Sequence, residues 1–128
     1  MSDIKATDIF NYKNLISLPV SSRTLFDSLL EWLIATKVGI YAARQNYITL
    51  PLTSYAKGLA IPNMKEAVKQ AKEDAEVLIK LTLRPKGKRN LIRPFGIIEV
   101  KNDGLSFEFE QAFLTAIEKY LQKTKKEA

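Results

Sequence analysis

Residues 61–78 read Ile-Pro-Asn-Met-Lys-Glu-Ala-Val-Lys-Gln-Ala-Lys-Glu-Asp-Ala-Glu-Val-Leu, a stretch that predicts one long amphipathic helix with a clear start. Pro62 ends the element before it, Asn63 is a good N-cap, and Glu66 stands where a capping-box acid would. Apolar residues then recur mostly at spacings of three and four along one side, at positions 64, 67, 68, 71, 75 and 78. A helix is therefore expected over residues 63–78, with most of its charged side chains on the other side.

The residues before this helix predict a short strand and a short helix. Tyr47-Ile-Thr-Leu-Pro-Leu52 has the composition of a strand, and its proline favours an edge of the sheet. Thr53 or Ser54 can cap a short helix that covers Tyr55-Ala-Lys-Gly-Leu59. A short helix, a turn and a longer helix then follow one another, which is the order of a helix-turn-helix.

The residues after the long helix predict a β-hairpin with a basic tip. Residues 78–83 alternate between apolar and polar side chains, residues 84–90 read Arg-Pro-Lys-Gly-Lys-Arg-Asn, and the chain returns through residues 91–100. Lys101-Asn-Asp-Gly104 is a strong turn signal, and the alternation in residues 105–109 predicts another strand of the same sheet.

The two ends of the chain complete the expected fold. Residues 12–19 predict an extended first strand, and Ser21 or Ser22 can cap a helix whose apolar stripe is Leu25, Phe26, Leu29, Leu30 and Leu33. A closing helix carries Phe113, Ala116, Ile117, Tyr120 and Leu121 on one face. The expectation is an α+β chain with one winged helix-turn-helix domain over residues 1–122, its helices packed on a small antiparallel sheet with a basic hairpin wing, and a charged tail over 123–128.

Composition excludes several classes of chemistry. The chain has no cysteine and no histidine, so it lacks thiolate metal ligands, cysteine nucleophiles and the commonest general base. The glycines form neither a P-loop nor a dinucleotide fingerprint. We therefore expect no enzyme, no metal and no cofactor. The N-terminus lacks the pattern of a signal peptide, and no apolar run approaches the roughly 18 residues of a membrane span, so a cytoplasmic protein without a membrane partner is expected.

The formal net charge of +6 favours a polyanionic partner, and two segments are candidates for its binding. Polar and basic residues of the long helix could reach base edges in the major groove of double-stranded DNA: Asn63, Lys65, Lys69, Gln70 and Lys72. The alternative is a solvated helix face of mixed charge, because Glu66, Glu73, Asp74 and Glu76 lie among the lysines.

The hairpin tip is the second candidate, as a phosphate-binding wing. It comprises Arg84, Lys86, Lys88, Arg89, Asn90 and Arg93. Such a cluster suits neutralisation of a nucleic-acid backbone, although lysines also protect exposed hairpins against edge-to-edge pairing. Four aromatic residues could stack on single strands, but their position beside apolar stripes favours ordinary packing: Trp32, Tyr41, Tyr47 and Tyr55.

The order of these elements resembles the winged-helix domain of plasmid and phage replication initiator (Rep) proteins. The resemblance is carried by residues 48–61, 67–74, 86–89 and 106–109. It implies binding to duplex repeats at a replication origin, with helix 63–78 in the groove and residues 84–93 on the backbone, and a homodimer through one face of the domain. Complete initiators generally carry two such domains and this chain has the length of one, so a fragment of a longer initiator or a stand-alone relative is expected, with a second domain or a partner protein as an additional partner. A transcriptional regulator of plasmid or phage genes and a winged-helix protein-interaction module are the alternatives.

Overall fold

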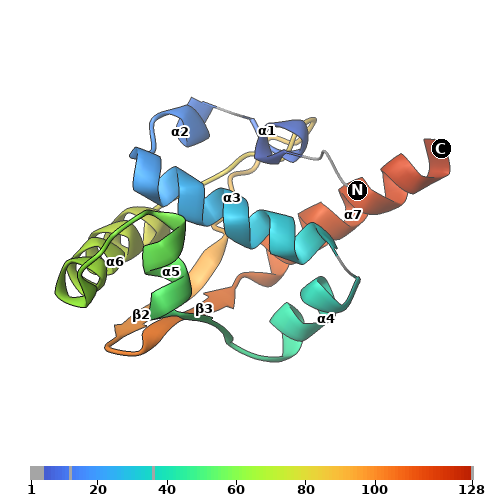
Figure 1. The fold of residues 1–128 in the computed structure, drawn as a ribbon. Coiled ribbons are helices and arrows are strands. Elements are labelled where there is room, and N and C mark those ends of the chain that lie inside the picture. Colours follow the sequence, from blue (N-terminus) through green and yellow to red (C-terminus); the bar gives the residue numbers. More distant parts are fainter. Residues whose placement is uncertain (1–4, 12, 36, 128) are drawn as a thin grey trace.

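The computed structural model describes residues 5–11, 13–35 and 37–127. Over these residues the chain forms seven helices and one three-stranded antiparallel sheet, which confirms the expected α+β class (Figure 1). Tyr12 of the predicted first strand, Met1–Ile4 and the tail residue Ala128 lie outside the described residues. The elements in chain order are α1 (Ala6–Ile9), α2 (Lys13–Ile16), α3 (Val20–Ala35), α4 (Lys37–Gln45), β1 (Ile48–Pro51), α5 (Leu52–Gly58), α6 (Met64–Ile79), β2 (Phe95–Lys101), β3 (Gly104–Phe109) and α7 (Gln111–Glu127).

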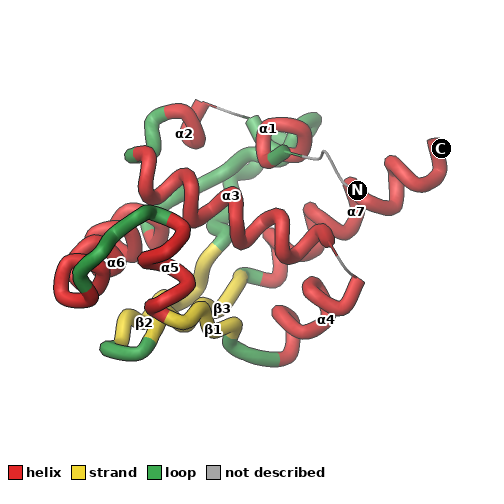
Figure 2. Tube along the Cα trace, in the orientation of Figure 1, coloured by secondary structure: helices red, strands yellow, loops and turns green. Residues whose placement is uncertain are grey.

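The sheet has the strand order β1-β3-β2, so β3 is central and β1 is an edge strand (Figure 2). The edge position predicted from Pro51 is therefore confirmed. Proline has no N–H to donate to a ladder, so it is tolerated in an edge strand. Ile48 pairs with Phe107 of β3, and Val100 of β2 pairs with Leu105. Strands β2 and β3 are joined by the predicted turn at residues 101–104.

One face of the sheet is covered by helices and the other is open to solvent. Phe95, Phe107 and Phe109 point into the core, where the Phe95 and Phe109 rings lie 5.2 Å apart. The predicted stripe of α3 and the Phe113 and Ile117 side chains of α7 are buried against this face. Helix α6 packs on β2, so its orientation is fixed by the sheet as well as by α3 and α5.

The predicted helices are present, but some of their neighbours differ from the expectation. The first strand is wrong, because residues 13–16 form α2, and α4 lies where no element was predicted. Helix α3 begins at Val20, so Ser21 and Ser22 lie in its first turn and their hydroxyls donate to Asp74. Helix α5 begins directly after Pro51 without a side-chain cap, so Thr53 and Ser54 do not cap it.

The predicted basic hairpin is wrong in its first arm and at the start of its second arm, whereas residues 95–100 of the second arm form a strand, β2, as predicted. Leu78 continues the buried side of α6, which runs to Ile79, so residues 78–79 are helical. A single bridge between Leu83 and Ile92 closes the segment between them, with N–H to O distances of 2.7 Å in both directions. Residues 84–93 therefore form a loop outside the three-stranded sheet, here called the basic loop. No helix in the described part of the chain is long and apolar enough to cross a membrane.

Candidate nucleic-acid interface

The start of α6 is fixed by a side-chain cap, as predicted. The Asn63 side chain accepts a hydrogen bond from the backbone N–H of Lys65 at 2.8 Å. This bond satisfies one of the amide donors that the first turn of a helix leaves free. Asn63 itself is exposed, so its amide NH₂ group faces solvent beside the positive end of the helix.

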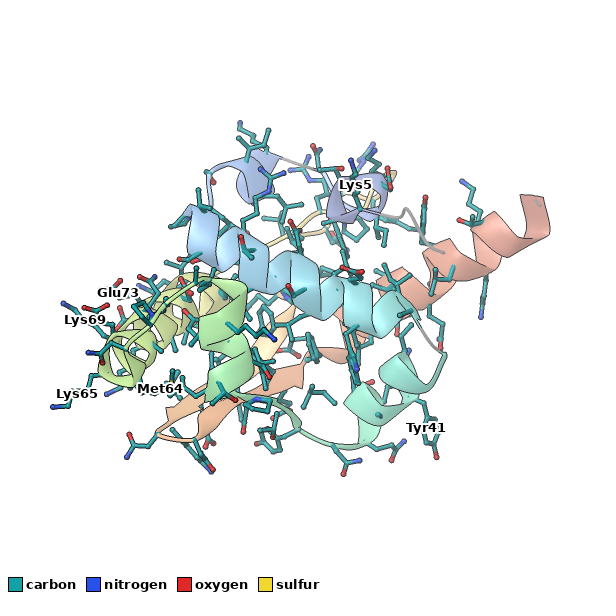
Figure 3. The ribbon with its side chains drawn as sticks, viewed as in Figure 1. Lys5, Tyr41, Met64, Lys65, Lys69 and Glu73 are labelled. Carbon is teal, nitrogen blue, oxygen red and sulfur yellow. The ribbon has the colours of Figure 1, made fainter. Side chains whose placement is uncertain are left out.

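The outer face of α6 carries both signs of charge. Lys65, Lys69 and Lys72 are exposed, and Figure 3 shows Lys65, Lys69 and Glu73 projecting away from the rest of the molecule. Within the described ranges none of the three lysines forms an ion pair. The exposed glutamates at positions 66, 73 and 76 balance them, and two of these lie in the C-terminal half. The positive part of this face is therefore its N-terminal half.

Gln70 does not belong to that outer face. Its Nε2 donates to Ser21 Oγ at 2.9 Å and to Asp74 Oδ1 at 3.2 Å, and the residue is partly buried. A side chain engaged in this way cannot also make a bidentate contact with a base edge. The structure thus separates Gln70 from the other four helix candidates and assigns it to the interior contact between α6 and α3.

Asp74 is the centre of this interior contact. Its carboxylate is 1 % exposed and accepts hydrogen bonds from Ser21 Oγ at 2.7 Å and Ser22 Oγ at 2.9 Å, and from the Tyr55 hydroxyl. Burial, followed by the hydrogen bond and negative charge of Asp74, raises the pKa of Tyr55, so the phenol stays protonated and remains a donor. The cluster joins α3, α5 and α6 and holds α6 in place.

The Asp74 cluster is difficult to predict from the sequence. The donors lie 53, 52 and 19 residues from Asp74 in the chain, so no local spacing connects them. Helical periodicity places Asp74 between Ala71 and Leu78 on the buried side, and this is the one local signal. A carboxylate at such a position must be hydrogen-bonded to be tolerated.

The basic loop presents all its candidate side chains to solvent. Its candidates are all exposed: Arg84, Lys86, Lys88, Arg89, Asn90 and Arg93. The loop backbone is nevertheless anchored, because the Asn11 N–H donates to the Arg84 carbonyl at 2.8 Å and the Lys86 N–H donates to the Ile9 carbonyl at 2.9 Å. Gly87 has a φ of 81°, which only glycine adopts readily at this tight turn.

The two candidate segments lie on different sides of α3. The bonds to Ile9 and Asn11 hold the basic loop against the N-terminal segment, whereas α6 packs with α5 and β2. In Figure 1 the loop passes behind α1, on the opposite side of α3 from α5 and α6. The structure therefore brings the six loop candidates together, but it does not merge them with Lys65, Lys69 and Lys72 into one patch.

The net charge of the chain is concentrated in the basic loop. The loop holds five of the 20 basic residues and no acid, which leaves 15 basic and 14 acidic residues elsewhere. The turn between β2 and β3 differs from the basic loop because it carries both signs of charge: Lys101 pairs with Glu99 at 3.9 Å, and Asp103 follows. Almost the whole excess of positive charge thus resides in ten consecutive residues.

Of the four aromatic residues considered as stacking groups, one lies in the core. Tyr55 is buried, whereas Trp32, Tyr41 and Tyr47 are 42 %, 68 % and 50 % exposed. Trp32 lies on α3 and Tyr41 on α4, and neither adjoins the basic loop in sequence. Of the two expected arrangements, core packing is confirmed for Tyr55 and wrong for the other three residues, whose packing at the edge of the core stays a prediction.

The chemistry available at these surfaces is the binding of anions. Arginine and lysine are charged at neutral pH, and their N–H groups form short, charge-assisted hydrogen bonds with phosphate oxygens. In residues 5–11, 13–35 and 37–127 no three acidic side chains gather as ligands for a metal ion. No protein-family model, no curated protein and no solved structure matches this chain.

Proposed function

We propose that this chain is a winged-helix domain that binds duplex DNA, with the basic loop as its principal contact to the phosphate backbone. The observation that carries the proposal is the group of five exposed loop cations on an anchored backbone. In the described part of the chain none of them forms an ion pair. A polyanion releases counterions when such a group binds, and this release supplies much of the affinity for DNA.

The topology supports the winged-helix part of the proposal. Helices α5 and α6 lie between β1 and β2 in the chain, and the strand order is β1-β3-β2. In a winged-helix domain the second helix of the pair enters the major groove and the hairpin of the sheet forms the wing. By this correspondence α6 is the recognition helix, and the turn at 101–104 is the wing. The basic loop is then an additional contact outside the wing.

Helix α6 approaches DNA with its N-terminal half in this proposal. Lys65 and Lys69 are exposed there and Lys72 follows at the middle of the helix, while Glu73 and Glu76 beyond it would meet repulsion from phosphates. The helix dipole adds a partial positive charge at the same end. Lysine contacts of this kind position the helix, and base discrimination would come from Asn63 and from whichever lysines reach base edges.

The process in which the chain binds DNA, replication or transcription, is also part of the proposal. The resemblance to replication initiators favours repeated sites at an origin, and the alternative is a regulator of plasmid or phage transcription. Selection of bound duplexes from a random library distinguishes the two, because an initiator selects sites that recur in tandem and a dimeric regulator selects a single palindrome. A protein-interaction module would select no duplex.

Fluorescence anisotropy with labelled duplex DNA tests the proposal. The variant Lys88→Gln/Arg89→Gln removes two loop charges, and we expect its affinity to fall about tenfold at 0.1 M salt. The matched control, Lys119→Gln/Lys123→Gln, removes two exposed charges from α7 and should bind within about twofold of the wild type. Absence of binding to any duplex at low salt, or equal losses in the two variants, would refute the proposal.

A further inference from the structure

A small hollow lies between α2 and the basic loop. It has a volume of about 150 Å³ and is lined by Asn11, Lys13, Asn14, Arg84 and Leu91. Arg84 alone among these residues is a candidate on sequence grounds. Lys13 and Asn14 lie in the segment predicted as the first strand, Asn11 directly precedes that segment, and Leu91 begins the predicted returning arm of the hairpin. The fold brings them together from positions about 70 residues apart in the chain.

The walls of the hollow are held by hydrogen bonds. Asn14 Nδ2 donates to the Thr82 carbonyl at 2.7 Å, which ties α2 to the start of the loop. The Asn11 N–H donates to the Arg84 carbonyl at 2.8 Å, which ties the other side. These bonds hold the two backbone segments that carry Lys13 and Arg84 beside one hollow, while both side chains are exposed. A preorganised site binds an ion at a lower entropic cost than two free side chains would.

The chemistry of the lining suits one phosphate group. Lys13 and Arg84 supply two positive charges, the side-chain amide of Asn11 supplies hydrogen-bond donors, and none of the five lining residues is acidic. The Asn14 amide is engaged by Thr82, whose carbonyl and hydroxyl oxygens lie 2.7 and 3.5 Å from Nδ2. At about 150 Å³ the hollow is half the size or less of the roughly 300–1,000 Å³ pockets that enclose whole small molecules. It is open to solvent, and its lining includes Arg84 of the basic loop. This shape favours a phosphate that belongs to an extended strand over an enclosed nucleotide.

We propose that this hollow is a phosphate-binding site in which Lys13 and Arg84 neutralise the anion and the Asn11 amide orients it, while the bond from Asn14 to Thr82 holds the wall of the site. The ligand is a backbone phosphate of the duplex that the basic loop contacts, so this assignment of the partner rests on the proposed function. The site extends the DNA-binding surface from the loop onto α2. In this proposal Lys13 contributes as much to duplex affinity as one cation of the basic loop.

Two measurements on the intact chain test the site. The first follows the side-chain amide NMR signals of Asn11 and Asn14 during titration with inorganic phosphate, with sodium chloride at equal ionic strength as the control. The second compares the duplex affinity of Lys13→Gln with that of Lys119→Gln, which removes an exposed charge from α7. We expect phosphate and duplex to shift the same two amide signals, and Lys13→Gln to bind duplex about three- to tenfold more weakly than its control.

The outcomes separate this site from the proposed function. If the wild type binds duplex but the amide signals do not move and Lys13→Gln matches its control, the hollow is refuted and DNA binding stands. If phosphate shifts the signals but no duplex binds at low salt, the phosphate site stands as a site for a free phosphate-bearing ligand and DNA binding is refuted. If neither ligand shifts the signals and no duplex binds, both proposals are refuted.

Discussion

Replacement of Asp74 by alanine should destabilise the fold by about 3 kcal/mol, because it removes the acceptor at the centre of the cluster that joins α3, α5 and α6. Asp74 is 1 % exposed and accepts from Ser21, Ser22, Tyr55 and Gln70. Ser21, Ser22 and Tyr55 lose this acceptor in the variant, whereas Gln70 keeps its bond to Ser21. The perturbation therefore acts on the contact that fixes the position of α6.

The size of this loss of stability follows from the burial of the donors. Ser22 and Tyr55 are 0 % and 3 % exposed, so water does not readily replace the lost acceptor, and an unsatisfied buried donor costs about 1–3 kcal/mol. Ser21 and Gln70 are partly exposed and can turn to water, so they add little. Removal of a buried carboxylate also relieves its desolvation, which offsets part of the loss. The sum is a substantial fraction of the roughly 5–15 kcal/mol that stabilises a domain.

Urea unfolding monitored by circular dichroism and by the fluorescence of the single tryptophan, Trp32, measures this change. Asp74→Asn keeps an acceptor for the serines but loses the charge, so about 1–2 kcal/mol is expected. The matched control is Glu73→Ala, which removes an exposed carboxylate one residue away and should lie within about 0.5 kcal/mol of the wild type. If Asp74→Ala is as stable as Glu73→Ala, the cluster does not hold α6 and this reasoning fails.

Three further changes test other parts of the fold. Gly104→Ala should cost about 1–3 kcal/mol in urea unfolding, because the added Cβ would lie 2.5 Å from the Leu50 carbonyl oxygen; Gly58→Ala, with no atom within 4 Å, is its control and should not destabilise. Arg44→Ala should cost about 1–2 kcal/mol, since its guanidinium bonds three side chains of α7, and an unchanged urea midpoint would contradict this. The raised pKa of Tyr55 stabilises the fold below its ordinary value of 10.0 and the contribution is lost as pH rises above it, so Tyr55→Phe should flatten the fall of stability measured above pH 10.

The sequence predicts the long elements because their patterns are long. The stripes of α3 and α7 repeat over several turns, and the cap at Asn63 adds an independent signal for α6. The turn at 101–104 is equally well marked, and the strands around it follow from their alternation. These local signals suffice for the α+β class.

The errors arise where a short apolar run fits two periods. Ile79, Leu81 and Leu83 alternate with Lys80 and Thr82, so residues 78–83 read as a strand. In the structure Leu78 completes the buried side of α6, which ends at Ile79, and Leu83 forms a bridge. Residues 13–16 present a similar ambiguity and form α2. A run of six residues or fewer contains too few turns to distinguish a helix end from a strand.

The charge of the candidate site could be predicted from the sequence, but the positions of its residues relative to one another could not. Exposure of the basic loop follows from its composition, and all six of its candidates are exposed. Gln70 was assigned to the outer face from its polarity, yet it bonds Ser21 on a different helix. The hollow beside Lys13 likewise depends on contacts between distant segments. Such tertiary contacts leave no trace in local spacing.

The salt dependence of duplex binding tests the central claim most directly. For a protein that neutralises phosphates, log affinity falls linearly with log salt, with a slope of roughly −0.9 for each contact. We predict a linear fall for the wild type, a slope smaller by about two in Lys88→Gln/Arg89→Gln, and an unchanged slope in Lys119→Gln/Lys123→Gln. Binding that is independent of salt, or a loop variant with the slope of the wild type, would contradict the claim that the basic loop binds the DNA backbone.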